Sequence, residues 1–341
     1  MSQKTKVTMR HIADRSGVSQ STVSLILSGS QSIKLAQATR DKVCRIAREM
    51  GYEQKKLAHA TAIEKIALIF NGLINNDPFI EAIYSAQQAA WQHNKLLAIF
   101  DLKNEPAHSA ALEEEISRGG YQGLIYASCP TTPLPALFVN LTLPVVLLNG
   151  YCPQRPDIPC ILPADKVGAY KATRHLAQQG YKRIAILTAE HGPETFNERI
   201  YGYRQALINH DICPDDRYIQ ITGNSLKEAC QKTLELLAFS PPPEAIFCSS
   251  DYIALGCYQA ILSRGLRIPE DIAVIGYNNQ SLSPELTPQL SSVDLSYREM
   301  GKMALSTLLK LTHRQPLLDK IMKVEGELIV RQSSVKPRPG L

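Results

Sequence analysis

The amino-acid sequence predicts an α/β protein, with a small helical N-terminal domain and a larger core of doubly wound parallel sheets in two lobes. Three observations support this prediction. The 341 residues suffice for two sizeable domains and a small module, at about 100–200 residues per domain. Apolar residues recur at helical spacing from Thr8 to Gly51, and beyond Ile66 short apolar strands alternate with amphipathic segments of helix length. This alternation runs twice along the chain, which indicates two lobes.

Two short helices joined by a glycine turn are predicted near the start of the chain. Thr8 can cap the first helix and Ser19 the second, because hydroxyl oxygens accept hydrogen bonds from unpaired backbone N–H groups. Gly17 between them supplies the permissive backbone of a tight turn. The side chains expected to pack the helices together are Ala13, Val18, Val23 and Ile26. Those expected to face outward at the start of the second helix are Gln20, Ser21, Ser24 and Leu25. The pattern is a helix-turn-helix, in which early residues of the second helix reach base edges.

Positive charge is concentrated in the first fifth of the chain. Up to Lys65 there are twelve Lys and Arg against five Asp and Glu, a net charge of +7, whereas the remainder carries 25 against 27. A surplus confined to one small segment suits attraction to a phosphate backbone, and a solvated tail would show the same excess. Charge alone therefore leaves nucleic-acid binding and a solvated tail both open.

Strands and helices alternate after a short polar linker. The expected strands are 66–70, 96–100, 123–128, 144–149, 183–188, 218–222, 245–250, 272–277 and 323–330. The expected helices are 79–93, 107–118, 168–179, 198–210, 226–239, 252–264 and 297–312. Such alternation implies right-handed βαβ crossovers and parallel sheets, whose ligands bind at the carboxyl ends of the strands.

Several classes of protein are disfavoured by what the sequence lacks. No apolar run approaches the ~18 residues needed to cross a bilayer and no signal pattern begins the chain, so we expect a cytoplasmic protein. The eight cysteines include no Cys-x-x-Cys pair and are expected to be reduced core residues. The chain has no G-x-S-x-G, no P-loop, no G-x-G-x-x-G after the first strand of the core and no metal-spaced histidine cluster. We therefore expect that the protein is not an enzyme and that it binds no metal and no cofactor.

A series of short motifs runs along the whole chain. The stretch VTMRHIADRSGVSQSTVSLILS contains IA, GVS and TVS at the spacing V-T-x-x-D-[IV]-A-x-x-A-G-V-S-x-x-T-V-S-R-x-[IL]-N. Further motifs are TRDKV at 39–43, MGY at 50–52, DPF at 77–79, RxxGY at 199–203, SDYIALG at 250–256, IPEDIAVIGYNN at 268–279 and LIVRQSS at 328–334. In this order they resemble the LacI/GalR family of bacterial transcriptional regulators. The resemblance implies a DNA-binding headpiece, a hinge and a two-lobed core similar to a periplasmic sugar-binding protein.

The resemblance implies a sequence-specific regulator, a repressor by expectation, whose operator affinity is controlled by a small ligand between the lobes. We expect a homodimer on a near-palindromic duplex, because two headpieces held by one core read two half-sites. The alternatives are an α/β enzyme or a plain sugar-binding protein, which would lack a basic headpiece. The expected boundaries are 1–52 for the headpiece, 53–65 for the hinge, 66–334 for the core with crossings near 160–165 and 278–296, and 335–341 for the tail.

The motif and the resemblance together imply a set of DNA-contacting residues. These are Thr8, Ser19, Gln20, Ser21, Thr22, Ser24, Leu25, Ala58 and Thr61. Leu25 stands where the family usually carries Arg, so we expect an apolar contact such as one with a thymine methyl group. Thr61 stands where a leucine normally enters the minor groove and kinks the DNA, and Leu57 is the alternative wedge. Whether the operator is kinked is left undecided by the sequence.

The resemblance also implies effector-binding residues. These are Asp77, Phe79, Asn149, Arg199, Asn224, Ser250, Asp251 and Asn278. Arg199 offers a planar fork of donors for ligand hydroxyls or acids, and Phe79 could cover a sugar face. Asn149 and Asn278 stand where family members commonly carry acids, so two carboxylates of the common sugar-binding pattern are absent.

Arg199 needs a compensating charge, because an unpaired buried charge is costly. Asp77 or Glu198 could supply that charge within the protein. The alternative is an anionic effector, such as a sugar phosphate or sugar acid, to which Asn149 and Asn278 would donate amide hydrogens. Uncharged sugars remain equally open.

Overall fold

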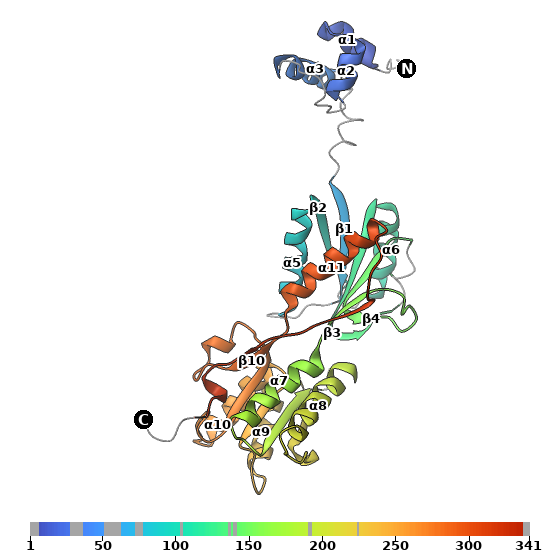
Figure 1. The fold of residues 1–341 in the computed structure, drawn as a ribbon. Coiled ribbons are helices and arrows are strands. Elements are labelled where there is room, and N and C mark those ends of the chain that lie inside the picture. Colours follow the sequence, from blue (N-terminus) through green and yellow to red (C-terminus); the bar gives the residue numbers. More distant parts are fainter. Residues whose placement is uncertain are drawn as a thin grey trace. The chain divides into compact units, whose positions relative to one another are not determined.

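The chain forms two compact units that divide between Glu64 and Lys65 (Figure 1). The structure is a computed structural model, and it describes residues 7–27, 37–50, 63–71, 78–102, 105–135, 138, 142–189, 193–223 and 225–336. Each unit is described by itself. Within these ranges, no helix has both the length and the apolar character that crossing a membrane requires.

The described part of the N-terminal unit is helical, as predicted. Its helices are α1 (Met9–Ser16), α2 (Gln20–Leu27) and α3 (Gln37–Glu49). Thr8 caps α1 as expected, because its Oγ1 accepts the His11 N–H at 3.5 Å while its own N–H donates to His11 Nδ1 at 3.4 Å. Gly17 ends α1 with a φ of 73°, the left-handed region that glycine adopts without strain. The buried core of this unit consists of Ile12, Ala13, Val23, Ile26, Val43, Ile46 and Ala47.

The first lobe of the core is a sheet covered by helices on both faces. The sheet order is β11 (Ile321–Val324), β5 (Cys160–Pro163), β4 (Val145–Tyr151), β3 (Tyr121–Pro133), β1 (Glu64–Phe70) and β2 (Lys95–Asp101). The pairs from β11 through β1 are parallel. Helices α5 (Ile80–Gln92) and α11 (Tyr297–Thr312) pack on one face, and α6 (Pro106–Arg118) packs on the other (Figure 1).

The second lobe repeats this arrangement. Its sheet order is β12 (Leu328–Ile329), β10 (Ser291–Asp294), β9 (Ala273–Asn278), β8 (Ala245–Cys248), β6 (Ile184–Ala189) and β7 (Ile219–Thr222). All pairs are parallel except β10 with β12. Helices α7 (Asp165–Gln178) and α8 (Pro193–Ile208) cover one face, and α9 (Leu226–Leu237) and α10 (Asp251–Ser263) cover the other. Short 3-10 helices lie at 216–218, 283–285 and 332–334. The predicted fold class is confirmed.

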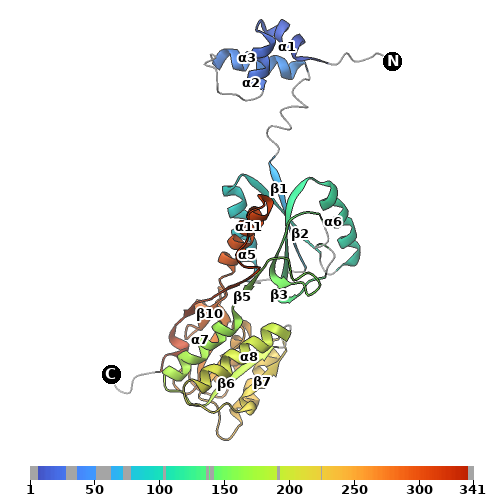
Figure 2. The ribbon, with the colours of Figure 1, turned by 45° about the vertical axis from the view of Figure 1, so that its right-hand side comes forward.

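Within the described residues, the chain passes between the two lobes at three places (Figure 2). These are 163–165 between β5 and α7, 294–297 between β10 and α11, and 324–328 between β11 and β12. The third passage corrects the expected single strand at 323–330, which is divided between the two sheets. Gly326 permits this passage, because a Cβ atom there would collide with the backbone oxygen of Asp294.

Candidate functional site

The exposed start of helix α2 is the candidate DNA-binding surface. Gln20, Ser21 and Ser24 are exposed, whereas Thr22 and Leu25 are half-buried. The side chains of Gln20 and Ser24 form no hydrogen bond within the part of the chain that the structure describes. Both are therefore able to pair with groups outside the unit, as base-reading side chains must.

The hydroxyl groups of Ser19, Ser21 and Thr22 form one cluster at the N-terminus of α2. Ser19 Oγ lies 2.7 Å from Ser21 Oγ and 2.8 Å from Thr22 Oγ1, and it accepts the Thr22 N–H at 3.1 Å. Ser19 thus caps α2 as predicted, and its cap bond fixes where the helix starts. Ser19 and Ser21 are both exposed, and Thr22 is half-buried.

The other two described helices of the unit carry exposed basic side chains. Arg10 on α1 and Lys42 and Arg45 on α3 are exposed. Such side chains suit phosphate oxygens, which position a protein on a duplex without reading its sequence. The predicted hinge contacts Ala58 and Thr61, with the alternative wedge Leu57, lie outside the described residues.

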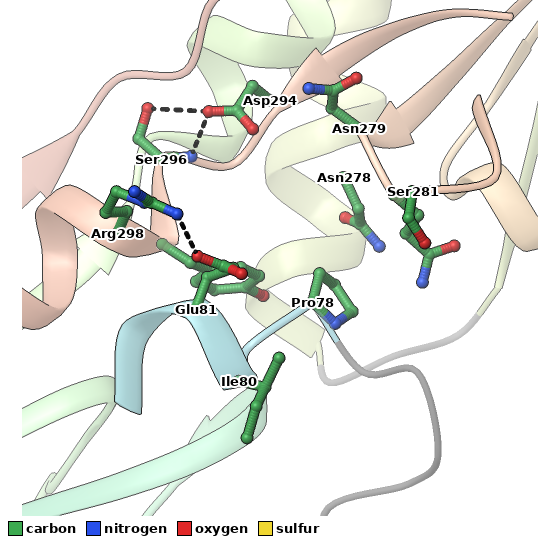
Figure 3. A pocket seen from close by; sticks show the side chains of 11 residues that line it. Pro78, Ile80, Glu81, Asn278, Asn279, Ser281, Asp294, Ser296 and Arg298 are labelled. Atoms are coloured by element: carbon green, nitrogen blue, oxygen red, sulfur yellow. Dashed lines mark hydrogen bonds and ion pairs between the residues drawn. The ribbon is translucent and has the colours of Figure 1, made fainter. Parts of the chain in front are cut away.

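The core contains a cavity of about 530 Å³ where the two lobes meet (Figure 3). The first lobe contributes the N-terminal ends of α5 and α11, and the second contributes the residues that follow β9 and the end of β10. The described lining residues are Pro78, Ile80, Glu81, Asn278, Asn279, Gln280, Ser281, Asp294, Ser296, Tyr297 and Arg298. The cavity is therefore at the carboxyl ends of parallel strands, where ligands of open α/β sheets bind.

Arg199 is buried beside this region and is paired within the protein. Its Nε atom donates to Asp165 Oδ1 at 2.9 Å, and its Nη2 atom lies 2.8 Å from the same oxygen in an ion pair. Nη1 donates to the Ser249 carbonyl oxygen at 2.6 Å. The guanidinium also lies over the Tyr277 ring, 4.0 Å from its centroid. The partner is Asp165, which corrects the expectation of Asp77 or Glu198. Glu198 instead pairs with Lys323 of the first lobe.

The surroundings of this pair shift the pKa values of both groups. Burial raises the pKa of the Asp165 carboxyl, although the charge of Arg199 and its hydrogen bonds act in the opposite direction. Burial is the largest influence on Arg199 and lowers its pKa, but the charge of Asp165, the hydrogen bond to it and the nearby Tyr277 and Tyr297 together raise the pKa of the guanidinium. Arg199 is thus a charged group whose counter-ion is built into the fold.

Asn149 is a structural residue of the first lobe, which corrects its expected role as a ligand contact. Its side chain is fully buried at the end of β4. Its Oδ1 accepts from Thr131 Oγ1 at 2.6 Å and its Nδ2 donates to the Ser128 carbonyl oxygen at 2.9 Å. The amide therefore ties β3 to β4, and it is not among the residues that line the cavity.

Asp251 is also structural, which corrects a second expectation. It is fully buried, and its Oδ2 accepts from the Gln280 N–H at 2.6 Å and Ser283 Oγ at 2.8 Å. Its Oδ1 accepts from Ser292 Oγ at 2.6 Å. These bonds fix the segment after β9, which lines the cavity. Burial raises the pKa of Asp251 to about 6, although the bond from Ser292 and the others lower it.

Phe79 is fully buried under the cavity and does not reach its surface. Its ring packs edge-on against Tyr297, with ring centroids 5.4 Å apart. Tyr297 lines the cavity, whereas Phe79, which was expected to cover a sugar face, is not among the lining residues. Phe79 therefore contacts the Tyr297 ring without lining the cavity itself.

Two further predicted residues lie at the carboxyl edge of the second sheet. Ser250 caps α10, because its Oγ accepts the Ile253 N–H at 3.1 Å, and it is partly exposed. Asn278 ends β9 with a φ of 97° and lines the cavity. Its Oδ1 is buried and has no hydrogen-bond partner among the described residues. Asp77 and Asn224 lie outside the described residues.

Sequence reasoning missed Asp165, Tyr297 and Asp294 as residues of this region. Asp165 begins α7 one residue after a strand of four residues that was itself not predicted. Asp294 and Tyr297 flank the second passage between the lobes, next to the strand β10, whose only apolar residue is Val293. Because neither β5 nor β10 was predicted, the carboxylates of Asp165 and Asp294 could not be recognised as lying at the ends of strands. In the described part of the chain, no group of His, Cys, Asp and Glu is arranged to hold a metal ion.

Two family models match parts of this chain. Residues 8–54 match the bacterial regulatory proteins of the lacI family, and residues 173–334 match a periplasmic binding protein-like domain. These ranges contain the predicted headpiece motif and most of the second lobe.

Curated relatives match over nearly the full length. The chain is 31% identical to the "Probable HTH-type transcriptional repressor ExuR" of Bacillus subtilis, over 96% of this chain and 98% of that protein. It is 28% identical to the "Ribose operon repressor" of Haemophilus influenzae, over 96% and 98%. It is 29% identical to the "HTH-type transcriptional repressor CytR" of Escherichia coli K12, over 97% of each chain.

Solved structures share the fold. A lac repressor dimer bound to operator and the anti-inducer ONPF matches with a TM-score of 0.73 and 23% identity, over 97% of this chain and 100% of that one. A complex of the transcriptional regulator CelR with cellobiose matches with a TM-score of 0.68 and 23% identity, over 96% and 100%. The arrangement of a helical N-terminal unit before a two-lobed core therefore recurs in proteins of known structure.

Proposed function

The chain belongs to the LacI family of bacterial regulatory proteins, and from this premise we propose how its two sites work. It is a sequence-specific DNA-binding repressor controlled by a small ligand. Helix α2 reads the operator, and the ligand occupies the cavity between the lobes of the core. The observation that carries this proposal is the exposed start of α2, where Gln20, Ser21 and Ser24 face solvent above an apolar core.

The proposed contacts with bases and with phosphates are assigned to different residues according to the chemistry of their side chains. Gln20 can form two hydrogen bonds with adenine, and Ser21 can donate to or accept from several bases. Arg10, Lys42 and Arg45 contact phosphates, which contribute affinity that depends on salt and not on sequence. The half-buried Leu25 is assigned an apolar contact with a thymine methyl group.

The proposed assembly is a homodimer on a near-palindromic operator. Support comes from the first lobe, where large apolar side chains are exposed on α5 and on the edge strand β2. These are Tyr84, Trp91, Leu96 and Ile99, each at least 36% exposed. Exposed apolar side chains on one helix and on a neighbouring edge strand suit burial against a second copy. Two copies would present two α2 helices to two half-sites.

The proposed ligand is a sugar or sugar derivative. A cavity of about 530 Å³ accommodates a molecule of this size, and polar side chains with one aromatic ring line it. Among the relatives, one is named a repressor of a ribose operon and one solved regulator is complexed with cellobiose.

The test begins with selection of binding sites from random duplexes by the full chain. We expect a near-palindromic consensus. Gln20→Ala should change the preferred bases in each half-site, whereas the matched control Glu49→Ala, at the exposed end of α3, should leave the consensus unaltered. A screen for sugars that change affinity for the selected duplex then tests ligand control. Failure to enrich any sequence, with the protein folded, would contradict the proposal.

A further inference from the structure

Strands β9 and β10 end side by side at the cavity. In their parallel register Asn278 is the partner of Asp294, and each is the last residue of its strand. Both side chains line the cavity (Figure 3). The sheet therefore places an amide and a carboxylate next to each other at the edge where a ligand binds.

The amide of Asn278 presents an unsatisfied acceptor. Its Oδ1 is buried and has no hydrogen-bond partner in the described part of the chain. A buried carbonyl oxygen without a donor costs free energy, so such atoms are normally paired in functional states. Because this atom is shielded, the amide must turn before a ligand can reach it, and that ligand must then bring an N–H or O–H group.

The carboxylate of Asp294 is only partly satisfied. Its Oδ2 accepts from the Ser296 N–H at 3.0 Å and lies 3.4 Å from Ser296 Oγ. Its Oδ1 accepts no hydrogen bond from any described residue, and no described Lys, Arg or His forms an ion pair with this side chain. An ionised carboxylate accepts only, so it also requires donors from a ligand.

The arginines of the region already have partners. Arg298 donates to Glu81 at 2.8 Å, and Arg199 is held by Asp165. Arg331 donates to Asn279 Oδ1 at 2.8 Å and to the Leu290 carbonyl oxygen at 2.6 Å. The described lining residues include two carboxylates, those of Glu81 and Asp294, and one guanidinium, that of Arg298. The charge balance therefore disfavours an anion in the cavity.

We infer that Asn278 and Asp294 are the specificity-determining pair of the effector site. They select a ligand that presents hydroxyl or amino donors and carries no negative charge. Sugar phosphates and sugar acids are rejected because Asp294 repels them and Arg199 is already neutralised by Asp165. This inference rests on the proposed function, because it assigns ligand chemistry to the cavity of that repressor.

The experiment compares sugars that differ in one group, using the full chain. D-glucose, D-glucosamine, D-glucuronate and D-glucose 6-phosphate form one set, and D-ribose with D-ribose 5-phosphate forms a second. Binding is measured by titration calorimetry for the natural chain and for Asp294→Asn, which keeps the shape of the side chain and the acceptor for Ser296. The matched control is Glu299→Gln, which removes an exposed carboxylate five residues further along the chain and outside the cavity lining.

We expect a neutral or amino sugar to bind at least ~10-fold more tightly than its acid or phosphate counterpart. Asp294→Asn should reduce that ratio at least ~10-fold, and Glu299→Gln should leave it unchanged. An advantage of glucosamine over glucose that disappears in Asp294→Asn identifies the donor as an ammonium group, and equal binding of the two identifies a hydroxyl group.

Two results would overturn the inference: tightest binding by an anionic sugar, or an unchanged ratio in Asp294→Asn. The proposed function fails separately, when the chain selects no duplex sequence while the sugars are still discriminated.

Discussion

Arg199 and Asp165 form a buried ion pair in which two nitrogen atoms of one side chain, Nε and Nη2, share one carboxylate oxygen of the other. The two residues are 7% and 2% exposed. The arginine of the RxxGY motif is therefore neutralised by the residue that begins α7, and it does not require a ligand charge. Of the two alternatives that the sequence left open for this arginine, a partner within the protein is therefore the one observed.

Removal of the Asp165 charge should destabilise the core strongly. Asp165→Asn leaves the guanidinium of Arg199 buried without a counter-ion, which typically costs about 3–5 kcal/mol. The matched control is Asp216→Asn, because Asp216 pairs with Arg204 on the same lobe at 2.7 Å but is 79% exposed. Exposed pairs contribute about 0–1 kcal/mol. Urea denaturation of the full-length variants measures both values, and equal losses in the two variants would show that the buried pair has no special role.

Asp251 should make the stability of the core fall as pH rises from about 4 to about 6. Its pKa is raised from the ordinary 3.8 to about 6, so within this window the folded chain holds a proton that the unfolded chain has released. The stabilisation is therefore complete below the unfolded pKa and is lost as pH rises through the folded pKa. At about 1.4 kcal/mol per pKa unit the full effect is about 3 kcal/mol.

The measurement for Asp251 is the difference in unfolding free energy between the natural chain and Asp251→Asn at several pH values. Asparagine keeps the shape of the side chain and cannot ionise. We expect the natural chain to lose stability relative to the variant between pH 4 and pH 6. Parallel curves would mean that Asp251 does not titrate in this range.

Gly17 should be required for the turn between α1 and α2. Its φ of 73° is costly for a residue with a Cβ atom, by about 1–2 kcal/mol, and Asn tolerates this region better. Since no atom lies within 4 Å of a Cβ built there, crowding does not contribute. Gly17→Ala should increase hydrogen exchange of the α1 and α2 amides and weaken binding to all duplexes equally, and Gly17→Asn should do so less. Equal exchange in the two variants would contradict this explanation.

The N-terminal unit could be predicted closely from the sequence because its determinants are local. Thr8, Gly17 and Ser19 act on neighbouring backbone groups, so the ends of α1 and the start of α2 follow from residue type and spacing. In the core, the alternation of strands and helices predicted the fold class. The strands that were missed are β5 and β10, and β10 contains a single apolar residue, Val293.

The effector site could be predicted only in part, because its contacts join distant segments. Asn149 and Asp251 occupy motif positions, yet each is enclosed by partners 18 to 41 residues away in the sequence. Asp165 meets Arg199 across 34 residues, and Asn278 meets Asp294 through sheet register. No local pattern encodes such pairings, so the sequence indicated the region of the site but not the roles of its residues.

The central claim is that the cavity controls operator affinity while α2 reads the sequence. Asn278→Gly tests it most directly, because glycine adopts the positive φ of this position and the change removes the whole amide side chain from the cavity lining. The measurement is affinity for the selected operator with and without the sugar found by calorimetry. We predict operator affinity within about twofold of the natural chain without sugar, and at least ~10-fold more sugar needed for the response. Loss of operator binding by a folded variant, or an unaltered response to the sugar, would contradict the claim.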